Sequence, residues 1–323
     1  DPSGARPTDV GALTLADLPW YGGVGALLDA EHPDLLWLTL SNERTPAAIQ
    51  AAVDAGVDVM SEKPGARTAN DLEAVARSAR DADTTVGFAY TWRGHPVAAD
   101  LRQRAVNGFF GDVRGFDLRF VASRLATRPT DHFLFDAAAS RGGIVQWLGV
   151  HWLDLVPWLL DDPIVRVDAD LSYGTDGIDV DDGAVVRLEL ASGTVGTLTT
   201  GYYLREGRYD TAIDVYGDAG RSSWDPMGPT FGFDGKTRIA YDSDRWPSTP
   251  HREVVHEYQP EPGYGGRWGR EFFERFLAAC HGDVPVPAGL DDAITVLRTL
   301  DAVYESAETD GWVRGRRRAP SRR

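Results

Sequence analysis

Residues 35–63 read LLWLTLSNERTPAAIQAAVDAGVDVMSEK, and this stretch decides the fold. The continuous apolar run at residues 35–40 is typical of a strand that is buried on both faces of a parallel sheet. A helix is predicted over residues 46–55, with Thr45 as its N-cap. A second short apolar strand follows at residues 57–60. The stretch therefore predicts a strand, a helix and a strand that make one crossover unit.

The alternation of predicted strands and helices continues after residue 63. A second helix is predicted to begin at Asn70 as its N-cap and to end near residue 82, and a third strand follows at residues 85–90. This β-α-β-α-β order predicts a parallel sheet covered by helices, with ligands gathered at the carboxyl ends of the strands. On the amino side, Gly23-Val24-Gly25 follows no strand, so we do not interpret it as a phosphate-binding turn.

The pattern changes beyond residue 111. Alternating polar and apolar residues predict antiparallel strands at residues 112–121, 164–173, 184–190 and 194–202. Helices are predicted at residues 144–160, 268–281 and 290–308. We therefore expect an α/β Rossmann-like parallel-sheet domain over residues 1–95. An α+β domain with a large, mostly antiparallel, open-faced sheet should follow over residues 96–323, with its last helix packing back on the first domain.

The composition of the chain disfavours several classes of protein. The 323 residues carry a net charge of −16, which disfavours binding to nucleic acid because such binding needs a basic surface. No apolar run approaches the roughly 20 residues that span a bilayer, and the one cysteine cannot form an internal disulfide. His251 and His256 have no third convergent ligand in the sequence, so no metal is expected. We predict a soluble, cytoplasmic protein without a membrane or nucleic-acid partner.

The first candidate for chemistry is Glu62-Lys63-Pro64, just past the second strand. An isolated Glu-Lys pair in a loop is most often a solvated ion pair worth less than about 1 kcal/mol. Here the position at a strand end and the scarcity of lysine favour a functional reading, since Lys63 and Lys236 are the only two lysines of the chain. A lysine general acid or base needs its pKa lowered from about 10.4 to about 7 or 8.

The second candidate is the segment GGIVQWLGVHWLD at residues 142–154. Trp147, His151 and Asp154 are spaced four and three residues apart, so in an α-helix they share one face. A histidine alone on such a face is often a core residue bonded to the backbone. With Asp154 one turn away to orient its imidazole, we favour a catalytic role for His151.

These two segments resemble the Gfo/Idh/MocA family of oxidoreductases, named after glucose-fructose oxidoreductase, inositol dehydrogenase and a rhizopine-catabolism protein. The likeness covers nearly the whole chain. It includes Glu62-Lys63-Pro64, the glycine pair followed by Gly-x-His-x-x-Asp, the Arg93-x-x-Pro96 motif and the turn at Ser41-Asn42. The family's glycine-rich βα unit is absent from the sequence and would precede residue 1, so we expect a chain that is cut or processed.

The resemblance implies an NAD(P)-dependent oxidoreductase, using NAD or NADP, that moves hydride to or from a sugar, polyol or similar carbon. By carry-over, Lys63 is the general acid or base and His151 holds the reacting hydroxyl. Arg93, Trp147 and Asp154 would bind the substrate. The cofactor would lie against Leu40, Ser41, Asn42, Thr45, Glu62 and Lys63. A cis Lys63–Pro64 bond and a homodimer or homotetramer through the C-terminal sheet are also implied.

The sequence departs from the family pattern at the position four residues before His151, where Trp147 replaces the usual Asp. Thr45 stands where the family usually has His, and Leu40-Ser41 replaces Thr-Pro. Trp147 could supply a flat apolar surface for a pyranose ring. Two other functions stay open: a non-catalytic sensor or subunit that binds a sugar or nucleotide, and a lyase or hydrolase that uses transient oxidation by bound NAD.

Overall fold

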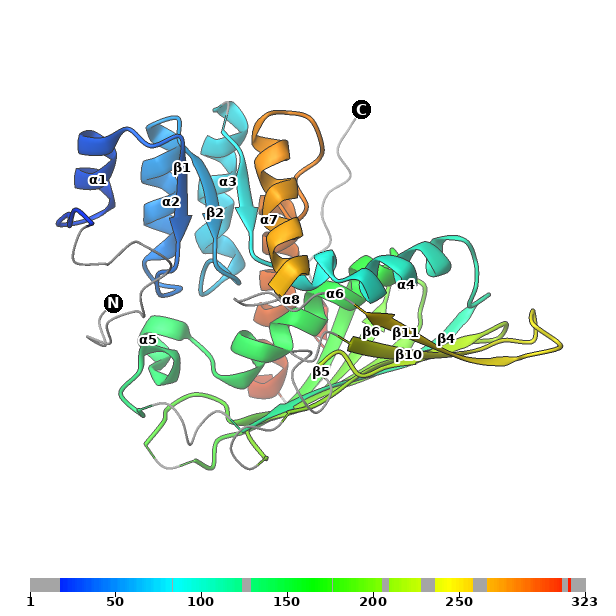
Figure 1. The fold of residues 1–323 in the computed structure, drawn as a ribbon. Helices are drawn as coiled ribbons and strands as arrows, with labels where there is room; N and C mark the ends of the chain where they lie inside the picture. The colour runs from blue at the N-terminus through cyan, green and yellow to red at the C-terminus, as the bar shows by residue number, and fades with distance from the viewer. Residues whose placement is uncertain are drawn as a thin grey trace.

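The computed structural model describes residues 18–309 and 313–314, except residues 83, 124–128, 176, 205–208, 228–235 and 258–265. It holds a small parallel sheet with helices and a large sheet with helices on one face (Figure 1). Residues 1–17, on which the expectation of a missing glycine-rich unit bears, lie outside the described residues.

The small sheet has three parallel strands in the order β1-β2-β3, as the apolar runs predict. Its strands are β1 (Leu35–Leu38), β2 (Asp58–Ser61) and β3 (Val86–Phe88). Its helices are α1 (Val24–Glu31), α2 (Thr45–Asp54) and α3 (Ala69–Asp81). The α2 helix buries Ile49, Ala52 and Val53, which lie on one helical face because they are spaced three and four residues apart.

Two predicted helix starts are wrong. Thr45 is the first residue of α2 and does not cap it; its hydroxyl donates to the carbonyl of Ser41 at 3.0 Å instead. The N-cap of α3 is Thr68 and not Asn70, because the carboxylate of Asp71 accepts from the Thr68 amide at 3.0 Å in a capping box. Thr68 and Asn70 are both preferred N-cap residues, so the sequence does not decide between them, whereas Arg44, which occupies the N-cap of α2, carries no such signal.

The large sheet has nine strands in the order β11-β10-β9-β8-β4-β7-β6-β5-β12. They are β4 (Val113–Ala122), β5 (Ile164–Ser172), β6 (Gly183–Leu190), β7 (Val195–Gly201), β8 (Tyr209–Gly217), β9 (Arg221–Trp224), β10 (Lys236–Asp242), β11 (His251–Glu257) and β12 (Val313–Arg314). The β6–β7 hairpin is confirmed, and its turn contains Gly193 at φ 91°, a conformation that favours glycine. All pairs are antiparallel except β4–β7, which is parallel.

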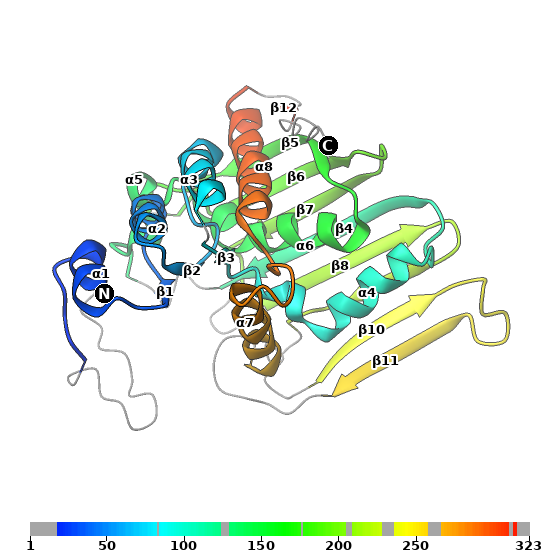
Figure 2. The same ribbon diagram turned by 90° about the horizontal axis from the view of Figure 1, so that it is seen from above.

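Helices cover one face of this sheet (Figures 1 and 2). They include α4 (Pro96–Val106), a π-helical segment (Val145–Gly149), α6 (Val150–Leu160) and α8 (Leu290–Thr309). The α7 helix (Gly266–Cys280) lies against the small sheet instead, where the ring of Phe273 is 4.7 Å from that of Trp37 in β1 (Figure 1). The indole nitrogen of Trp152 on α6 donates to the carbonyl of Arg119 in β4 at 2.8 Å, which ties helix to sheet.

The α8 helix lies against both sheets. The Arg298 guanidinium pairs with Glu73 on α3 at 2.9 Å, and the hydroxyl of Ser306 accepts from the Ala169 amide in β5 at 3.1 Å. The α8 helix therefore connects α3, beside the small sheet, to β5 of the large sheet.

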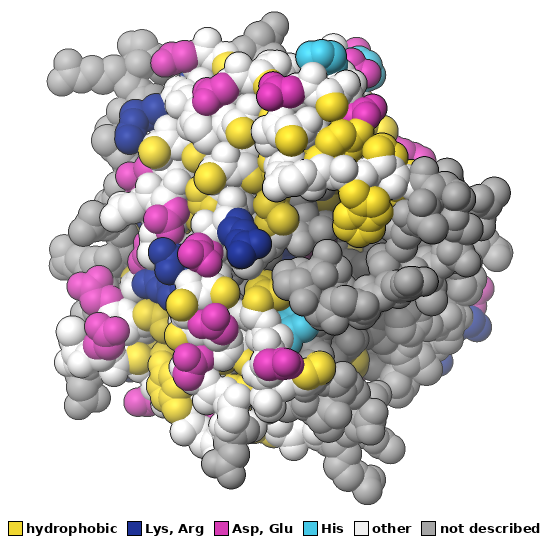
Figure 3. Space-filling model, turned by 90° about the vertical axis from the view of Figure 1, so that its left-hand side faces the viewer, with side chains coloured by type: hydrophobic (Ala, Val, Ile, Leu, Met, Phe, Trp, Pro, Cys, Tyr) yellow, Lys and Arg dark blue, Asp and Glu magenta, His cyan; other side chains and the backbone are white. Residues whose placement is uncertain are grey.

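Acidic side chains are spread over the surface and do not form one patch in the view of Figure 3. In the view of Figure 3, acidic side chains are scattered among hydrophobic and neutral ones, with fewer Lys and Arg between them. Within the described part of the chain, no helix is long and apolar enough to cross a bilayer.

Candidate active site at the carboxyl ends of the parallel strands

The Glu62-Lys63 pair lies directly after β2, where the carboxyl ends of the parallel strands meet. The Glu62 amide donates to the Leu38 carbonyl at 2.8 Å, and the Ala89 amide donates to the Ser61 carbonyl at 2.9 Å. These bonds extend the sheet to the candidate residues and fix the start of the loop. The Lys63–Pro64 bond is cis, as the family resemblance implies.

The structure brings Lys63, Trp147 and His151 together although they are far apart in the chain. The Nζ of Lys63 donates to the carbonyl oxygen of Trp147 at 2.6 Å. His151 is 4% exposed, and burial lowers its pKa well below the usual value, with the positive charge of Lys63 as the second cause. His151 is therefore neutral at pH 7, and a neutral imidazole offers one donor and one acceptor nitrogen.

The helix that carries Trp147 and His151 is not a regular α-helix. Residues Val145–Gly149 form a π-helical segment, and α6 begins only at Val150. The prediction of one α-helix over residues 144–160 is therefore wrong at its first turn. A π-helical insertion changes which residues share a face, and such insertions occur frequently at functional sites.

Glu62 is half-buried beside this group. Burial raises the pKa of its carboxyl group, while the charge of Lys63 and the Lys63 backbone amide lower it. The side chain can accept hydrogen bonds in its ionised form and donate one when protonated.

The loop after β1 lies against the segment that leads into the π-helix. Asn42 is buried, and its Nδ2 donates to the Ser140 carbonyl at 3.2 Å. The Glu43 amide donates to the Ala139 carbonyl at 3.2 Å. Ser41 is half-buried and Leu40 is exposed at this end of β1. Asn42 therefore links the two halves of the candidate site.

Arg93 and Asp154 form a buried ion pair. The Nε and Nη2 of Arg93 donate to the two carboxylate oxygens of Asp154 at 3.0 and 2.5 Å, and the two side chains are 8% and 1% exposed. Arg93 also contacts Asp292 at 3.1 Å. Burial raises the pKa of the Asp154 carboxyl, and the charge of Arg93 opposes that rise. Because both Asp154 oxygens are engaged, the predicted substrate-binding role of this pair stays a prediction.

Sequence reasoning missed Asp181. Its carboxylate accepts from the amides of Gly143 at 2.6 Å and Val145 at 3.0 Å, at the start of the π-helical segment. No spacing rule connects residue 181 to residues 143–145. The one available signal is the glycine pair itself, because adjacent glycines indicate a close approach by another part of the chain.

Two family descriptions match the chain. Residues 8–90 match the oxidoreductase family with an NAD-binding Rossmann fold, and residues 98–223 match the GFO/IDH/MocA C-terminal domain. Together the two matches cover about two thirds of the sequence.

Individual relatives agree. The chain is 26% identical over 303 residues to D-xylose 1-dehydrogenase (NADP(+)) 2 of Haloferax volcanii, covering 90% of this chain and 82% of that protein. It is 30% identical over 211 residues to a myo-inositol dehydrogenase of Streptomyces leeuwenhoekii, covering 64% and 62%. A levoglucosan dehydrogenase structure in complex with NADH and levoglucosan superimposes with a TM-score of 0.79 at 20% identity, covering 92% and 84%. At that identity the likeness supports the fold.

Proposed function

Because the chain belongs to the Gfo/Idh/MocA family of NAD-binding oxidoreductases, we propose that it transfers hydride between NAD or NADP and a C–OH carbon of a sugar or polyol. Its relatives are named as dehydrogenases of D-xylose and myo-inositol, and these define the substrate class to test. We propose Lys63 as the general acid or base. The observation that carries this proposal is the placement of Lys63 Nζ beside a neutral His151 at the carboxyl end of β2.

The residues at this edge fit the nicotinamide and ribose part of the cofactor. The site offers an amide at Asn42, a carboxylate at Glu62 and an ammonium group at Lys63, all at the strand ends where open α/β sheets bind nucleotides. This set supplies both donors and acceptors for the carboxamide and hydroxyl groups. Leu40, Ser41 and Thr45 are the proposed neighbours on the β1 side.

The proposed reaction balances with the residues present. When bound, the oxidised cofactor would supply the acceptor for the hydride that leaves the carbinol carbon of the substrate. In that direction the neutral amine of Lys63 takes the hydroxyl proton, so the C–O single bond becomes a carbonyl and Lys63 becomes an ammonium. Neutral His151 donates to, or accepts from, the same oxygen and so orients it. In reduction, the Lys63 ammonium returns its proton to the carbonyl oxygen.

The half-buried Trp147 is the proposed wall of the sugar pocket. Its ring lies 6.2 Å from that of Tyr202, tilted by 44°, so the two aromatic side chains are neighbours. Aromatic faces suit the apolar C–H face of a pyranose ring.

We also propose that two copies associate through the open face of the nine-stranded sheet, opposite the helices in Figure 1. Exposed apolar side chains lie on several of its strands, among them Val185 at 51%, Tyr216 at 38% and Val255 at 44% exposure. Light scattering of the protein and of Val185→Asp tests this: a dimer that the variant weakens supports the proposal, and a monomeric parent refutes it.

The function is tested by titrating NADH and NADPH into the protein and by assaying D-xylose, myo-inositol and levoglucosan with NAD⁺ and NADP⁺. Turnover of one of these that falls at least 100-fold in Lys63→Ala, while the nucleotide still binds through the remaining groups at Asn42 and Glu62, is the expected result. Lys236→Ala is the matched control, since Lys236 is 53% exposed and pairs with Glu257 in β11. Binding without turnover in parent and variant would favour the sensor alternative, and absence of nucleotide binding would refute the dehydrogenase assignment.

A further inference from the structure

The turn that leads into the π-helical segment is held by one carboxylate. Asp181 is 0% exposed, and its two oxygens accept separately from the amides of Gly143 and Val145. The backbone carbonyl of Asp181 accepts from the intervening amide of Ile144 at 3.0 Å. Three consecutive backbone amides at the start of this helix therefore donate hydrogen bonds to Asp181.

Gly142 and Gly143 leave the space that this close approach of Asp181 needs. A Cβ atom on Gly143 would overlap the carbonyl oxygen of Asp181, and one on Gly142 would overlap the hydroxyl of Tyr304. The close approach of Asp181 and Tyr304 thus gives a physical reason for glycine at both positions.

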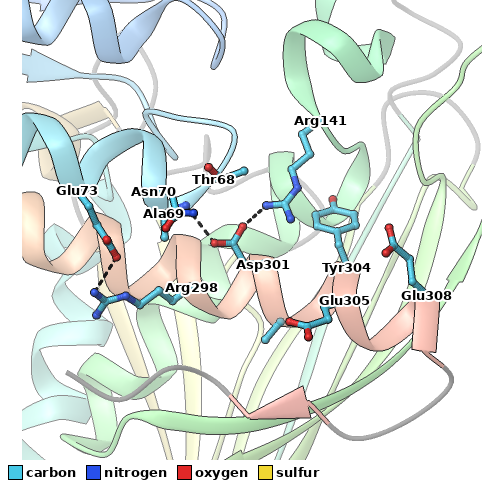
Figure 4. Close-up of a pocket in the computed structure, with 11 residues that line it drawn as sticks. Thr68, Ala69, Asn70, Glu73, Arg141, Arg298, Asp301, Tyr304, Glu305 and Glu308 are labelled. Carbon is cyan, nitrogen blue, oxygen red and sulfur yellow. Dashed lines mark hydrogen bonds and ion pairs between the residues drawn. The ribbon is translucent and has the colours of Figure 1, made fainter. Parts of the chain in front are cut away.

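Residues on and beside α8 brace the carboxylate of Asp181. Figure 4 shows three of these residues, Arg141, Asp301 and Tyr304, at a cavity of about 280 Å³. The Tyr304 hydroxyl donates to Asp181 Oδ1 at 3.0 Å, and the Arg141 guanidinium lies 4.9 Å from the centre of the Tyr304 ring. Arg141 also pairs with Asp301, whose other oxygen accepts from the Ala69 amide at 3.1 Å. The brace therefore connects the start of α3, the residue before the glycines and α8.

Two hydrogen bonds connect the segment that Asp181 holds, residues 143–147, to Lys63, the candidate catalytic lysine. The Trp147 amide donates to the Gly143 carbonyl at 2.9 Å, and the Trp147 carbonyl accepts from Lys63 Nζ. We propose that Asp181 is a positioning residue that holds residues 143–147 in place and so fixes the carbonyl that orients the Lys63 ammonium. This inference rests on the proposed function only where it treats Lys63 as the acid-base group.

Asp181→Asn is the informative substitution. An asparagine nearly preserves shape, but its amide nitrogen is a donor and cannot accept from the Gly143 or Val145 amide. One of the two anchors is lost, and the Trp147 carbonyl becomes free to move away from Lys63. Losing this acceptor removes stabilisation from the ammonium form, so Lys63 gives up its proton at a lower pH.

The chain offers a direct readout because Lys63 and Lys236 are its only lysines. Lysine labelled with ¹³C at Cε gives two NMR signals, which Lys63→Ala assigns, and each is titrated with pH. In folded Asp181→Asn we expect the Lys63 midpoint to fall by at least about 0.5 pH unit while that of Lys236 stays constant. An unchanged Lys63 midpoint in the folded variant overturns the proposal.

Asp182→Asn is the matched control. This neighbouring carboxylate is also buried, but it accepts from Ser172, Gly174 and Thr175 and not from the glycine turn. We expect it to leave the Lys63 titration unchanged. An equal shift in both variants would show a general loosening of the fold and would overturn a specific role for Asp181.

If Asp181→Asn does not fold, Tyr304→Phe decides the question. It removes only the hydroxyl that braces Asp181 and keeps the ring beside Arg141. A smaller shift of Lys63 in the same direction supports the proposal, and no shift overturns it. The titration needs no substrate, so a protein that binds no nucleotide and oxidises no sugar fails the proposed function while this inference is still decided on its own.

Discussion

The Nζ of Lys63 and the carbonyl oxygen of Trp147 lie 2.6 Å apart, which joins the loop after β2 to the π-helical segment 84 residues later. The contact gives the lysine side chain a fixed direction toward the π-helical segment. In the proposed reaction the same nitrogen must also exchange a proton with the hydroxyl group of the sugar. Position and proton transfer are thus two separable tasks of one side chain.

Lys63→Arg separates these tasks. Arginine keeps a cation that can donate to the Trp147 carbonyl, but a guanidinium stays protonated in proteins and so cannot accept a proton. We expect turnover to fall at least about 100-fold, to nearly the level of Lys63→Ala, while nucleotide affinity changes little. Steady-state kinetics and nucleotide titration check this. Activity within a few fold of the parent would show that the charge alone suffices.

Much of the fold follows from local sequence pattern. The three apolar runs of the parallel sheet and the β6–β7 hairpin each lie within a short window, and their hydrophobic period is set by strand geometry. The parallel pairing of β4 with β7 depends instead on strands 80 residues apart, as in Phe116 opposite Gly196. No local period encodes such a pairing, so it could not be predicted.

In the candidate site, too, some features follow from local sequence and others depend on residues far apart in the chain. The sequence predicts Lys63 and His151 as site residues because a strand end and a glycine-led helix are visible in it, and their catalytic roles stay a prediction. The sequence does not predict the π-helical segment, and the amides that lead into it bond to Asp181, which follows 36 residues after Val145 and shares no motif with it. Tertiary hydrogen bonds overrode the α-helical period on which the shared face of residues 147, 151 and 154 was based.

Trp147 is expected to determine sugar affinity. Trp147→Asp removes the aromatic face, so the KM for the sugar that the parent oxidises should rise at least about 5-fold, with the nucleotide KM unchanged. Trp147→Phe keeps a flat ring and should stay within about 2-fold. Initial-rate measurements with both variants test this. An unaltered sugar KM in Trp147→Asp would contradict the stacking role.

Capping of α3 can be tested on two neighbouring residues. Asp71→Ala removes the carboxylate that accepts from the Thr68 amide and should cost about 1 kcal/mol of unfolding free energy. Asn70→Ala changes an exposed residue in the same turn and should cost less than about 0.5 kcal/mol. Urea unfolding of both variants measures the difference. Equal costs would argue against the capping box.

His95 should make the fold sensitive to acid. Burial, helped by the nearby His256, lowers the pKa of His95 to about 3, and its Nδ1 accepts from the Val97 amide at 3.2 Å. The folded pKa lies below the unfolded value of about 6.5, so His95 has almost no effect above pH 7. Below pH 6.5 the unfolded chain binds a proton that the folded chain does not, and stability falls as the pH falls.

Between pH 7 and pH 5 this one group should remove about 2 kcal/mol of stability. His95→Asn can still cap α4 but does not titrate in this range, so its loss over the same interval should be smaller by about that amount. Urea unfolding at the two pH values gives both numbers. Parallel pH dependences for parent and variant would show that His95 does not resist protonation.

The Arg93–Asp154 pair decides between a structural and a substrate-binding role. Both side chains are nearly inaccessible, so Arg93→Met leaves a buried carboxylate without its partner and should cost about 3 to 5 kcal/mol. Adding Asp154→Leu removes that stranded charge. If the pair is structural, the double variant should recover most of the lost stability, because apolar replacement of a buried ion pair is often close to neutral.

Kinetics of the double variant complete the argument. A structural pair predicts a sugar KM within about 3-fold of the parent once the fold is restored, since neither side chain then touches the substrate. A stable double variant whose sugar KM rises 10-fold or more would assign the pair to substrate binding, as the family resemblance implies. Asp292→Asn serves as the control, because it weakens the outer contact of Arg93 at 3.1 Å and leaves the bidentate bond to Asp154 in place. If Asp292→Asn raised the sugar KM as much as the double variant, the effect would follow the position of Arg93 rather than its bond to Asp154.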